Sequence, residues 1–263
     1  MSYINIAFGV TNDWLEHTFT VICSVLSNSD SSSEFKFFIM SDIPVEEFNK
    51  RFSDILSKLR VINNRFECEY IMMDNSEFDG VVHDRRVGIA AYYRLKLGSM
   101  VNVDKILYLD SDIVVLKDIS TLWNYDTEKF YIGAVEDKYS ALMGWRAGLQ
   151  ENEIYINSGV LLMNLKKFRE DKLEDKIFEK LREDNNDYSD QDVLNYICKG
   201  KILYLPLKYN LMLTVDDENS FPERKVEYQD SLNDPVVLHY SIKPWVIPVQ
   251  YCEYWAKYHN ILV

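Results

Sequence analysis

Segments typical of strands and segments typical of helices alternate through the first half of the chain, and this alternation constrains the fold more than any other feature. Three segments rich in aromatic and β-branched residues, at 3–10, 35–40 and 66–73, are typical of strands. Between them, residues 14–28 and 44–59 carry apolar residues at the spacing of amphipathic helices. The alternation predicts an α/β protein with a Rossmann-like, mainly parallel central sheet and helices on both faces.

The second half of the chain is less regular but still contains both kinds of segment. We expect strands at 155–165, 202–206 and 235–240, and helices at 166–184, 189–200 and 250–260. Ser189 or Asp190 is placed to cap the start of the second of these helices, and Gly200 lies past its end. No repeat or low-complexity linker divides the sequence, so we predict one domain over residues 1–263.

The apolar segment KILYL at 105–109 is followed directly by Asp110, Ser111 and Asp112. In parallel α/β sheets, ligands bind beyond the carboxyl ends of the strands, where these residues would lie. Paired carboxylates are the ligands that Mg²⁺ and Mn²⁺ prefer. The alternative is a pair of solvated acids in a turn.

Four further groups of residues have side chains suited to a binding site. Arg94 and Lys96, within AAYYRLKLG, could clamp phosphates, and the alternative is a solvated basic pair on a helix. Gly159 in the predicted strand permits a bulge or the close approach of a ligand. Asp190 and Gln191 offer groups suited to sugar hydroxyls, although helix capping also explains Asp190. His239 ends a predicted strand, where it could bind a metal or be structural.

Composition excludes some partners and some kinds of site. A formal net charge of −13 argues against nucleic acid and against an anionic membrane surface as the main partner. No run of about 18 apolar residues occurs, so no transmembrane segment is predicted. The N-terminal residues have no basic, apolar signal-peptide pattern, and the four cysteines show no CxxC spacing. These features favour a reduced, cytoplasmic protein.

Five segments, in order, resemble the motifs of glycosyltransferase family 8: YYRLKLG, KILYLDSDIVVLKDI, YINSGVLLMNLKKF, YSDQDVLNY and HYSIKPW. That family includes bacterial lipopolysaccharide galactosyl- and glucosyltransferases and the glycogenins. The resemblance runs from about residue 4 to about residue 258. It implies a GT-A fold and transfer of a hexose from UDP-glucose or UDP-galactose, with retention of anomeric configuration. It also implies a saccharide or glycoconjugate acceptor and Mn²⁺, or Mg²⁺, as cofactor.

The resemblance also implies roles for individual residues. Metal ligands would be Asp110, Asp112 and His239. Lys243 would reach the diphosphate, and Arg94 the phosphate–sugar region. Residues that line the donor sugar or its surroundings would be Ser111, Asn157, Ser158 and Gly159. Asp190 would bind sugar hydroxyls, and Gln191 would stabilise the reacting anomeric carbon rather than attack it. The nucleotide-binding half would end near residue 115, with the acceptor-side half at 116–263.

The N-terminal FGVTNDWL resembles the glycogenin-like form of the family motif. The uridine contacts implied by it are Gly9, Thr11, Asn12 and Asp13, with Trp14 stacking on uracil. The sequence departs from the family in two places, because Thr11 replaces a common Asp and HYSIKPW lacks the glycine of the longer HYxGxxKPW form.

Two alternative functions stay open. Haloacid-dehalogenase-like phosphatases also place DxD after an apolar strand, and VDDEN at 215–219 would then supply their later acidic pair. A non-catalytic nucleotide-sugar binder would keep the same ligand contacts without transfer. Homo-oligomerisation is also left open by the sequence.

Overall fold

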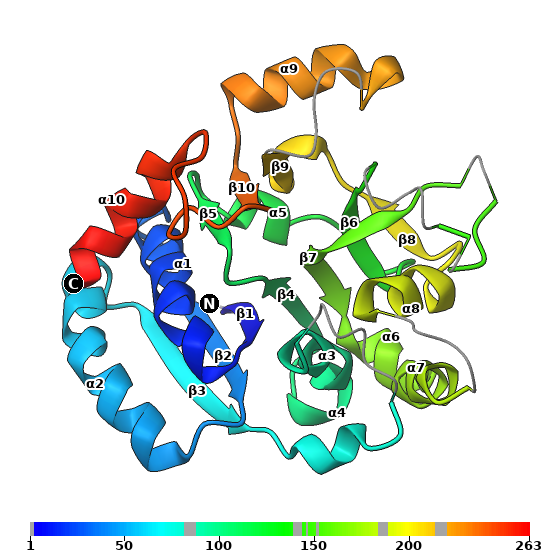
Figure 1. The fold of residues 1–263 in the computed structure, drawn as a ribbon, viewed down its shortest axis with the longest axis horizontal. Coiled ribbons are helices and arrows are strands. Elements are labelled where there is room, and N and C mark those ends of the chain that lie inside the picture. Colours follow the sequence, from blue (N-terminus) through cyan, green and yellow to red (C-terminus); the bar gives the residue numbers. More distant parts are fainter. Residues whose placement is uncertain are drawn as a thin grey trace.

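The computed structural model describes residues 3–81, 88–138, 144–145, 147–150, 153–183, 189–213 and 220–263. Its centre is a seven-stranded sheet in the order β3-β2-β1-β4-β7-β6-β8 (Figure 1). These strands are β1 (Ile4–Gly9), β2 (Phe35–Ser41), β3 (Phe66–Met72), β4 (Lys105–Leu109), β6 (Ile132–Glu136), β7 (Ile156–Asn164) and β8 (Ile202–Tyr204). Only β7 runs antiparallel to its neighbours, β4 and β6. The predicted α/β fold with a mainly parallel sheet is confirmed.

Helices cover both faces of this sheet, as the sequence predicts (Figure 1). One face carries α1 (Leu15–Ser27), α2 (Val45–Ile62) and α10 (Cys252–Leu262). The other face carries α3 (Ala90–Tyr93), α4 (Leu97–Met100), α6 (Leu165–Glu170), α7 (Leu173–Leu181) and α8 (Asp190–Ile197). The strands are buried on both sides: Leu107 belongs to the first core and its neighbour Ile106 to the second. This explains why the strands read as continuous apolar runs.

A second, three-stranded sheet was not predicted, and it positions part of the site. Its strands are β5 (Ile113–Val115), β10 (Val237–Tyr240) and β9 (Leu211–Leu213), in the order β5-β10-β9. In the antiparallel β5–β10 pair, His239 lies opposite Ile113. A residue more than 120 positions away is thereby placed beside the Asp110–Asp112 turn. Strands of three residues are too short to give a recognisable pattern.

The charged helix predicted at 166–184 is wrong in one respect, because the structure divides it into α6 and α7. The break is at Lys172, whose φ is 52°. In a continuous helix of 3.6 residues per turn, Leu173 would point about 140° away from Phe168. The break allows both of these buried side chains to enter the same core. The short helix α5 (Ser120–Trp123), the helix α9 (Lys225–Asn233) and the strand β6 were also not predicted.

Candidate active site

The two aspartates that follow β4 lie beside a histidine from β10. One carboxylate oxygen of Asp110, one of Asp112 and one ring nitrogen of His239 all lie within 4.8 Å of one another. The backbone N–H of Asp110 donates to the carbonyl of Gly159 on β7 at 2.8 Å. The turn is therefore fixed to the sheet, and the side chains converge at its carboxyl edge.

Two basic side chains contact Asp112. Nε2 of His239 lies 3.3 Å from its Oδ1, and the Lys243 ammonium group pairs with its Oδ2. Burial alone would raise the pKa of Asp112, but the charges of His239 and Lys243 lower it well below its usual range. Burial alone would lower the pKa of His239, yet the facing carboxylate raises it above its ordinary value.

Arg94 is buried between two other carboxylates. Its guanidinium group lies 2.9 Å from Asp110 and 3.3 Å from Asp190, and it also donates to the carbonyl of Ser158. The group stacks over the Tyr108 ring at 4.2 Å. Desolvation raises the pKa of Asp190, and Arg94 opposes that rise. Arg94 therefore lies in the predicted site, where it links β4, β7 and α8. The prediction that Lys96 joins it is wrong, because Lys96 pairs with Glu77 and Glu174 instead.

Gly159 lies so close to two of these side chains that a larger residue would not fit. An ideal Cβ at this position would lie 2.5 Å from Cε1 of His239 and 2.7 Å from Oδ2 of Asp110. The register between β6 and β7 is also irregular next to it, between Ala134 and Glu136. The pairing is irregular where the sequence suggested a bulge, and the Gly159 backbone lies against His239 and Asp110. Two carboxylate oxygens and an imidazole nitrogen that converge in this way are chemically suited to Mn²⁺ or Mg²⁺.

Gln191 is held at the start of α8 by several hydrogen bonds. Its Oε1 accepts from the backbone N–H of Ser158 at 2.9 Å, and its Nε2 donates to Asp137 at 3.1 Å. Asn157 also donates to Asp137, at 3.2 Å. Ser189 is the N-cap of α8 and forms a reciprocal capping box with the third residue of the helix. The side-chain amide of Gln191 is thus fixed in one orientation next to residues 157–159.

Two residues of this network were missed by sequence reasoning. Asp137 follows β6, a strand that the sequence did not reveal. Asn210 lies before β9, and its Oδ1 is 2.9 Å from Nδ1 of His239. The Nδ2 group of Asn210 donates to Oδ1 of Asn157 at 2.8 Å. A buried asparagine (2% exposed) between two short elements gave no sequence signal that could have identified it.

The N-terminal candidates lie in and around the 3-10 helix η1 (Asn12–Trp14). Asn12 and Asp13 are exposed, and Trp14 packs edge-on against Trp245 with ring centroids 5.4 Å apart. The ammonium group of Lys243 lies 5.4 Å from the Trp14 ring centroid. Because Lys243 also pairs with Asp112, the N-terminal segment lies next to the acidic turn after β4. Thr11, the residue before η1, is half-buried.

Two other candidates have contacts within the fold. A Cβ on Gly9 would lie 2.5 Å from the carbonyl oxygen of Ala90, so glycine is needed there for packing. Ser111 exchanges a buried hydrogen bond of 2.8 Å with Thr18. The acidic pair at 215–219 required by the phosphatase alternative lies outside the described residues.

The model of one protein family, "Glycosyl transferase family 8", matches residues 5–247 of this chain. The chain belongs to glycosyltransferase family 8. Its similarity to the crystal structure of galactosyltransferase LgtC in complex with donor and acceptor sugar analogs has a TM-score of 0.80 at 27% identity. That similarity covers 99% of this chain and 96% of the other. The predicted GT-A fold is confirmed, and the chain is a family 8 glycosyltransferase.

Three curated relatives match this chain at 25–31% identity. A lipopolysaccharide 1,2-glucosyltransferase of Escherichia coli is 27% identical over 98% of this chain and 78% of its own length. General stress protein A of Bacillus subtilis (strain 168) is 25% identical over 89% of this chain and 84% of its own length. Glycosyltransferase GlyF of Streptococcus pneumoniae serotype 4 is 31% identical over 92% of this chain, which spans only 57% of that protein. In the described part of this family 8 chain, no helix is both long enough and apolar enough to cross a membrane.

Proposed function

We propose that this protein is a metal-dependent, retaining hexosyltransferase that moves glucose or galactose from a UDP-sugar to a saccharide or glycoconjugate. The observation that carries the proposal is the convergence of one ligand atom each from Asp110, Asp112 and His239 within 4.8 Å of one another, against the backbone of Gly159. These residues would hold Mn²⁺ or Mg²⁺. When bound, such a cation supplies charge neutralisation for the diphosphate leaving group.

Asp110, Asp112 and His239 are called the triad below. The residues around the triad have side chains suited to the parts of a UDP-sugar. Lys243 lies between Asp112 and the Trp14 ring, where an ammonium group can contact a diphosphate whose uracil base lies near Trp14. Asn12 and Asp13, next to Thr11, are exposed and could contact the uridine, although the Asn12 side-chain oxygen already accepts a hydrogen bond from Arg51. Gly9 would act indirectly, because it lets β1 pack close to α3. Ser111 would act indirectly as well, because its hydrogen bond to Thr18 fixes the proposed metal-binding turn to α1.

The donor sugar would lie between the triad and the start of α8. Ser158 and Asn157 line this region, and Asp190 offers a carboxylate to sugar hydroxyls. We assign Gln191 as the group that stabilises positive charge at the anomeric carbon, because its amide oxygen carries a partial negative charge and its side chain is held by Ser158 and Asp137. Arg94 would hold Asp110 and Asp190 at the correct separation, within reach of the phosphate–sugar region. A cytoplasmic location is supported by the four cysteines, all of which are free thiols.

The proposal is tested by the melting temperature with UDP, with Mn²⁺ and with both. A ligand at about 100 times its Kd stabilises the folded state by about 2.7 kcal/mol. At about 2–4 °C per kcal/mol, the two ligands together should raise the melting temperature by roughly 5–10 °C. UDP alone should raise it much less, and adding EDTA should reverse the shift.

The matched variants are Asp112→Asn and Asp104→Asn. Both remove one negative charge next to β4, but Asp104 is exposed at the opposite end of that strand and pairs with Arg169. We expect the shift to be absent in Asp112→Asn and unchanged in Asp104→Asn. An equal shift in both variants, or a full shift with UDP and EDTA, would contradict the metal site. Release of phosphate from a generic phosphatase substrate without sugar transfer would favour the phosphatase alternative.

Replacing Asn210 by alanine should weaken metal binding without removing a ligand. Asn210 holds Nδ1 of His239 at 2.9 Å, which leaves Nε2 directed toward Asp112. Loss of such an orienting partner typically lowers metal affinity by about 10–100-fold. Titration of Mn²⁺ at saturating UDP measures this change directly. A titration midpoint equal to that of the wild type would show that packing alone orients His239.

A further inference from the structure

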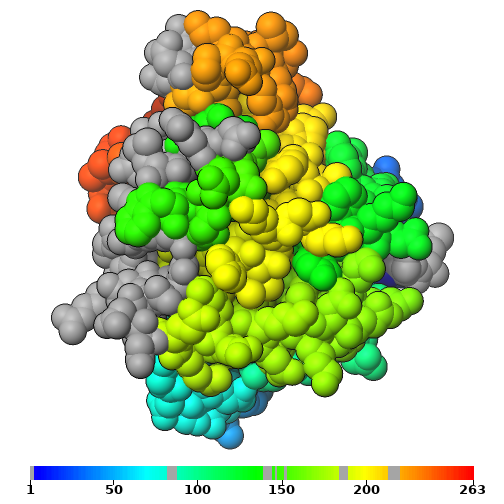
Figure 2. All heavy atoms as spheres, turned by 90° about the vertical axis from the view of Figure 1, so that its right-hand side faces the viewer, coloured from blue at the N-terminus to red at the C-terminus, as the bar shows by residue number. Residues whose placement is uncertain are grey.

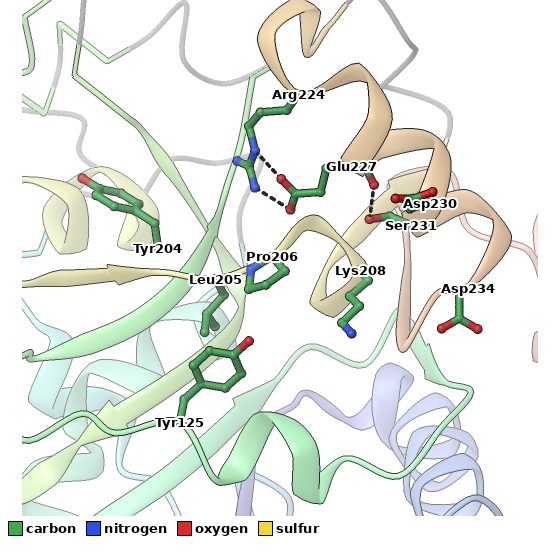
Figure 3. Close-up of a pocket in the computed structure, with 10 residues that line it drawn as sticks. All are labelled: Tyr125, Tyr204, Leu205, Pro206, Lys208, Arg224, Glu227, Asp230, Ser231 and Asp234. Carbon is green, nitrogen blue, oxygen red and sulfur yellow. Dashed lines mark hydrogen bonds and ion pairs between the residues drawn. The ribbon is translucent and has the colours of Figure 1, made fainter.

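A pocket of about 530 Å³ lies outside the triad and its neighbours. One wall is the helix α9 with the preceding 3-10 helix η6 (Pro222–Arg224), and the other is the segment from β8 through the 3-10 helix η5 (Leu207–Tyr209). In Figure 2 the orange α9 rests on the yellow β8–η5 segment, and the two helices α9 and η5 are in contact. Figure 3 shows the lining side chains: Tyr125, Tyr204, Leu205, Pro206, Lys208, Arg224, Glu227, Asp230, Ser231 and Asp234. The volume falls within the range of about 300–1,000 Å³ found for small-molecule sites.

Some of the charged groups in the pocket are already satisfied by protein partners. Arg224 forms two contacts with Glu227, at 2.7 and 2.8 Å (Figure 3), and a third with Glu136 at 3.0 Å. Asp234 pairs with Lys117. The charges of the lining residues Arg224, Glu227 and Asp234 are therefore paired within the protein and need no ligand.

Other polar groups in the pocket have no such partner. Within the described residues, the carboxylate of Asp230 and the hydroxyl of Tyr204 take part in no hydrogen bond or ion pair, and Tyr204 is 47% exposed. Lys208 is half-buried, and its ammonium group lies only over the Tyr209 ring, 5.2 Å from the centroid. An acceptor-only group and a donor-only group thus line one pocket without pairing with each other.

We propose that this pocket is a second saccharide-binding site, which takes a neutral sugar chain. Hydroxyl groups both donate and accept, so one polyol can satisfy Asp230 and Lys208 together. Tyr204 and Tyr125 add aromatic surface for the apolar face of a sugar ring. Lining acids outnumber lining bases by three to two, which disfavours phosphates and acidic sugars. This inference goes beyond the transferase activity, because no pocket residue belongs to the proposed donor site.

The position of the pocket suggests its use. The wall segment that carries Tyr204 and Lys208 continues directly into Asn210, which contacts His239 and Asn157. A saccharide bound here would be held on the far side of this segment from the donor. Such a site would retain a distant part of a sugar chain while its end reacts.

Binding is tested with the full chain by saturation-transfer NMR, using maltotriose, lactose and 3′-sialyllactose as probes. We expect maltotriose or lactose to bind, and sialyllactose, which adds a carboxylate to lactose, to bind more weakly. Tyr204→Ala and Asp230→Asn should each weaken binding by about tenfold, as expected for loss of one hydrogen-bonding or aromatic partner. Both positions are exposed, and melting curves will confirm that the variants fold.

Two matched variants separate this pocket from the donor site. Glu223→Gln removes a negative charge from the adjacent η6 at a residue that does not line the pocket, and it should bind like the wild type. Asp112→Asn should lose the UDP–Mn²⁺ shift but keep saccharide binding. The inference is overturned if neither neutral probe binds, if the pocket variants bind normally, or if binding disappears in Asp112→Asn. Sialyllactose that binds as tightly as lactose would overturn the assignment of a neutral ligand.

Discussion

One methyl group added at position 159 should abolish the joint stabilisation by UDP and Mn²⁺ and should lower sugar transfer by at least about 100-fold, since displacements near 1 Å have effects of that size. The new Cβ in Gly159→Ala would lie 2.5 Å from His239 and 2.7 Å from Asp110. Both are firmly held, His239 by Asn210 and Asp110 by Arg94. One or both must move away, and the three ligand atoms then no longer converge.

Gly133→Ala is the matched control for this substitution. Gly133 lies on β6, opposite Leu162 of β7, so both substitutions add a methyl group to the same strand pair. A Cβ at position 133 would find its nearest neighbours at 3.5 Å, which is an ordinary contact distance. We expect Gly133→Ala to bind and transfer normally. Overpacking typically costs about 1–3 kcal/mol, so melting curves in the absence of ligands measure that cost separately from the loss of binding. A normal ligand shift in Gly159→Ala would show that the triad tolerates this displacement.

Replacement of Arg94 by methionine should destabilise the protein more than any other single charge removal discussed above. The Arg94 side chain is buried and is the cation between Asp110 and Asp190. Removing one partner of a buried ion pair typically costs about 3–5 kcal/mol, because a charge is left uncompensated. At about 2–4 °C per kcal/mol, the melting temperature should fall by roughly 6–20 °C.

Lys199→Met supplies the comparison for an exposed pair. Lys199 lies 2.6 Å from Glu153 at the surface, and such pairs contribute about 0–1 kcal/mol. Arg94→Lys retains the charge but has a single ammonium group, which cannot reproduce the separate contacts to Asp110, Asp190 and the Ser158 carbonyl. We expect its melting temperature to lie between those of the wild type and Arg94→Met. Similar small losses in Arg94→Met and Lys199→Met would show that solvent or relaxation compensates Asp110 and the buried Asp190.

The sequence was sufficient to predict the central sheet because its strands are long and buried on both faces. β1, β2, β3 and β4 were each expected within a few residues of their observed bounds. It was insufficient for β5, β6 and β9 and for the break at Lys172, which depend on packing between distant segments. Short elements carry too few residues for periodicity to distinguish them from loops.

The same distinction applies to the candidate site. Asp110, Asp112 and His239 could be proposed from family motifs, and the structure brings their side chains together. The roles assigned to individual residues, and the division of the chain near residue 115, remain predictions. Asn210 and Asp137 could not be foreseen, because their importance comes from hydrogen bonds to residues far away in the sequence. Arg94 was expected to contact a phosphate, whereas in the structure its guanidinium group forms ion pairs with Asp110 and Asp190.

The placement of β10 beside β5 also sets when the proposed metal site can first form during synthesis. His239 and Lys243 are added to the chain more than 120 residues after Asp112, yet both contact that aspartate. At about 5–20 residues per second, a ribosome needs roughly 6–25 s to cover that interval. During this time the nascent chain has both aspartates but neither of these two partners. Under the proposed function, donor binding should therefore begin only after β10 has emerged from the ribosome.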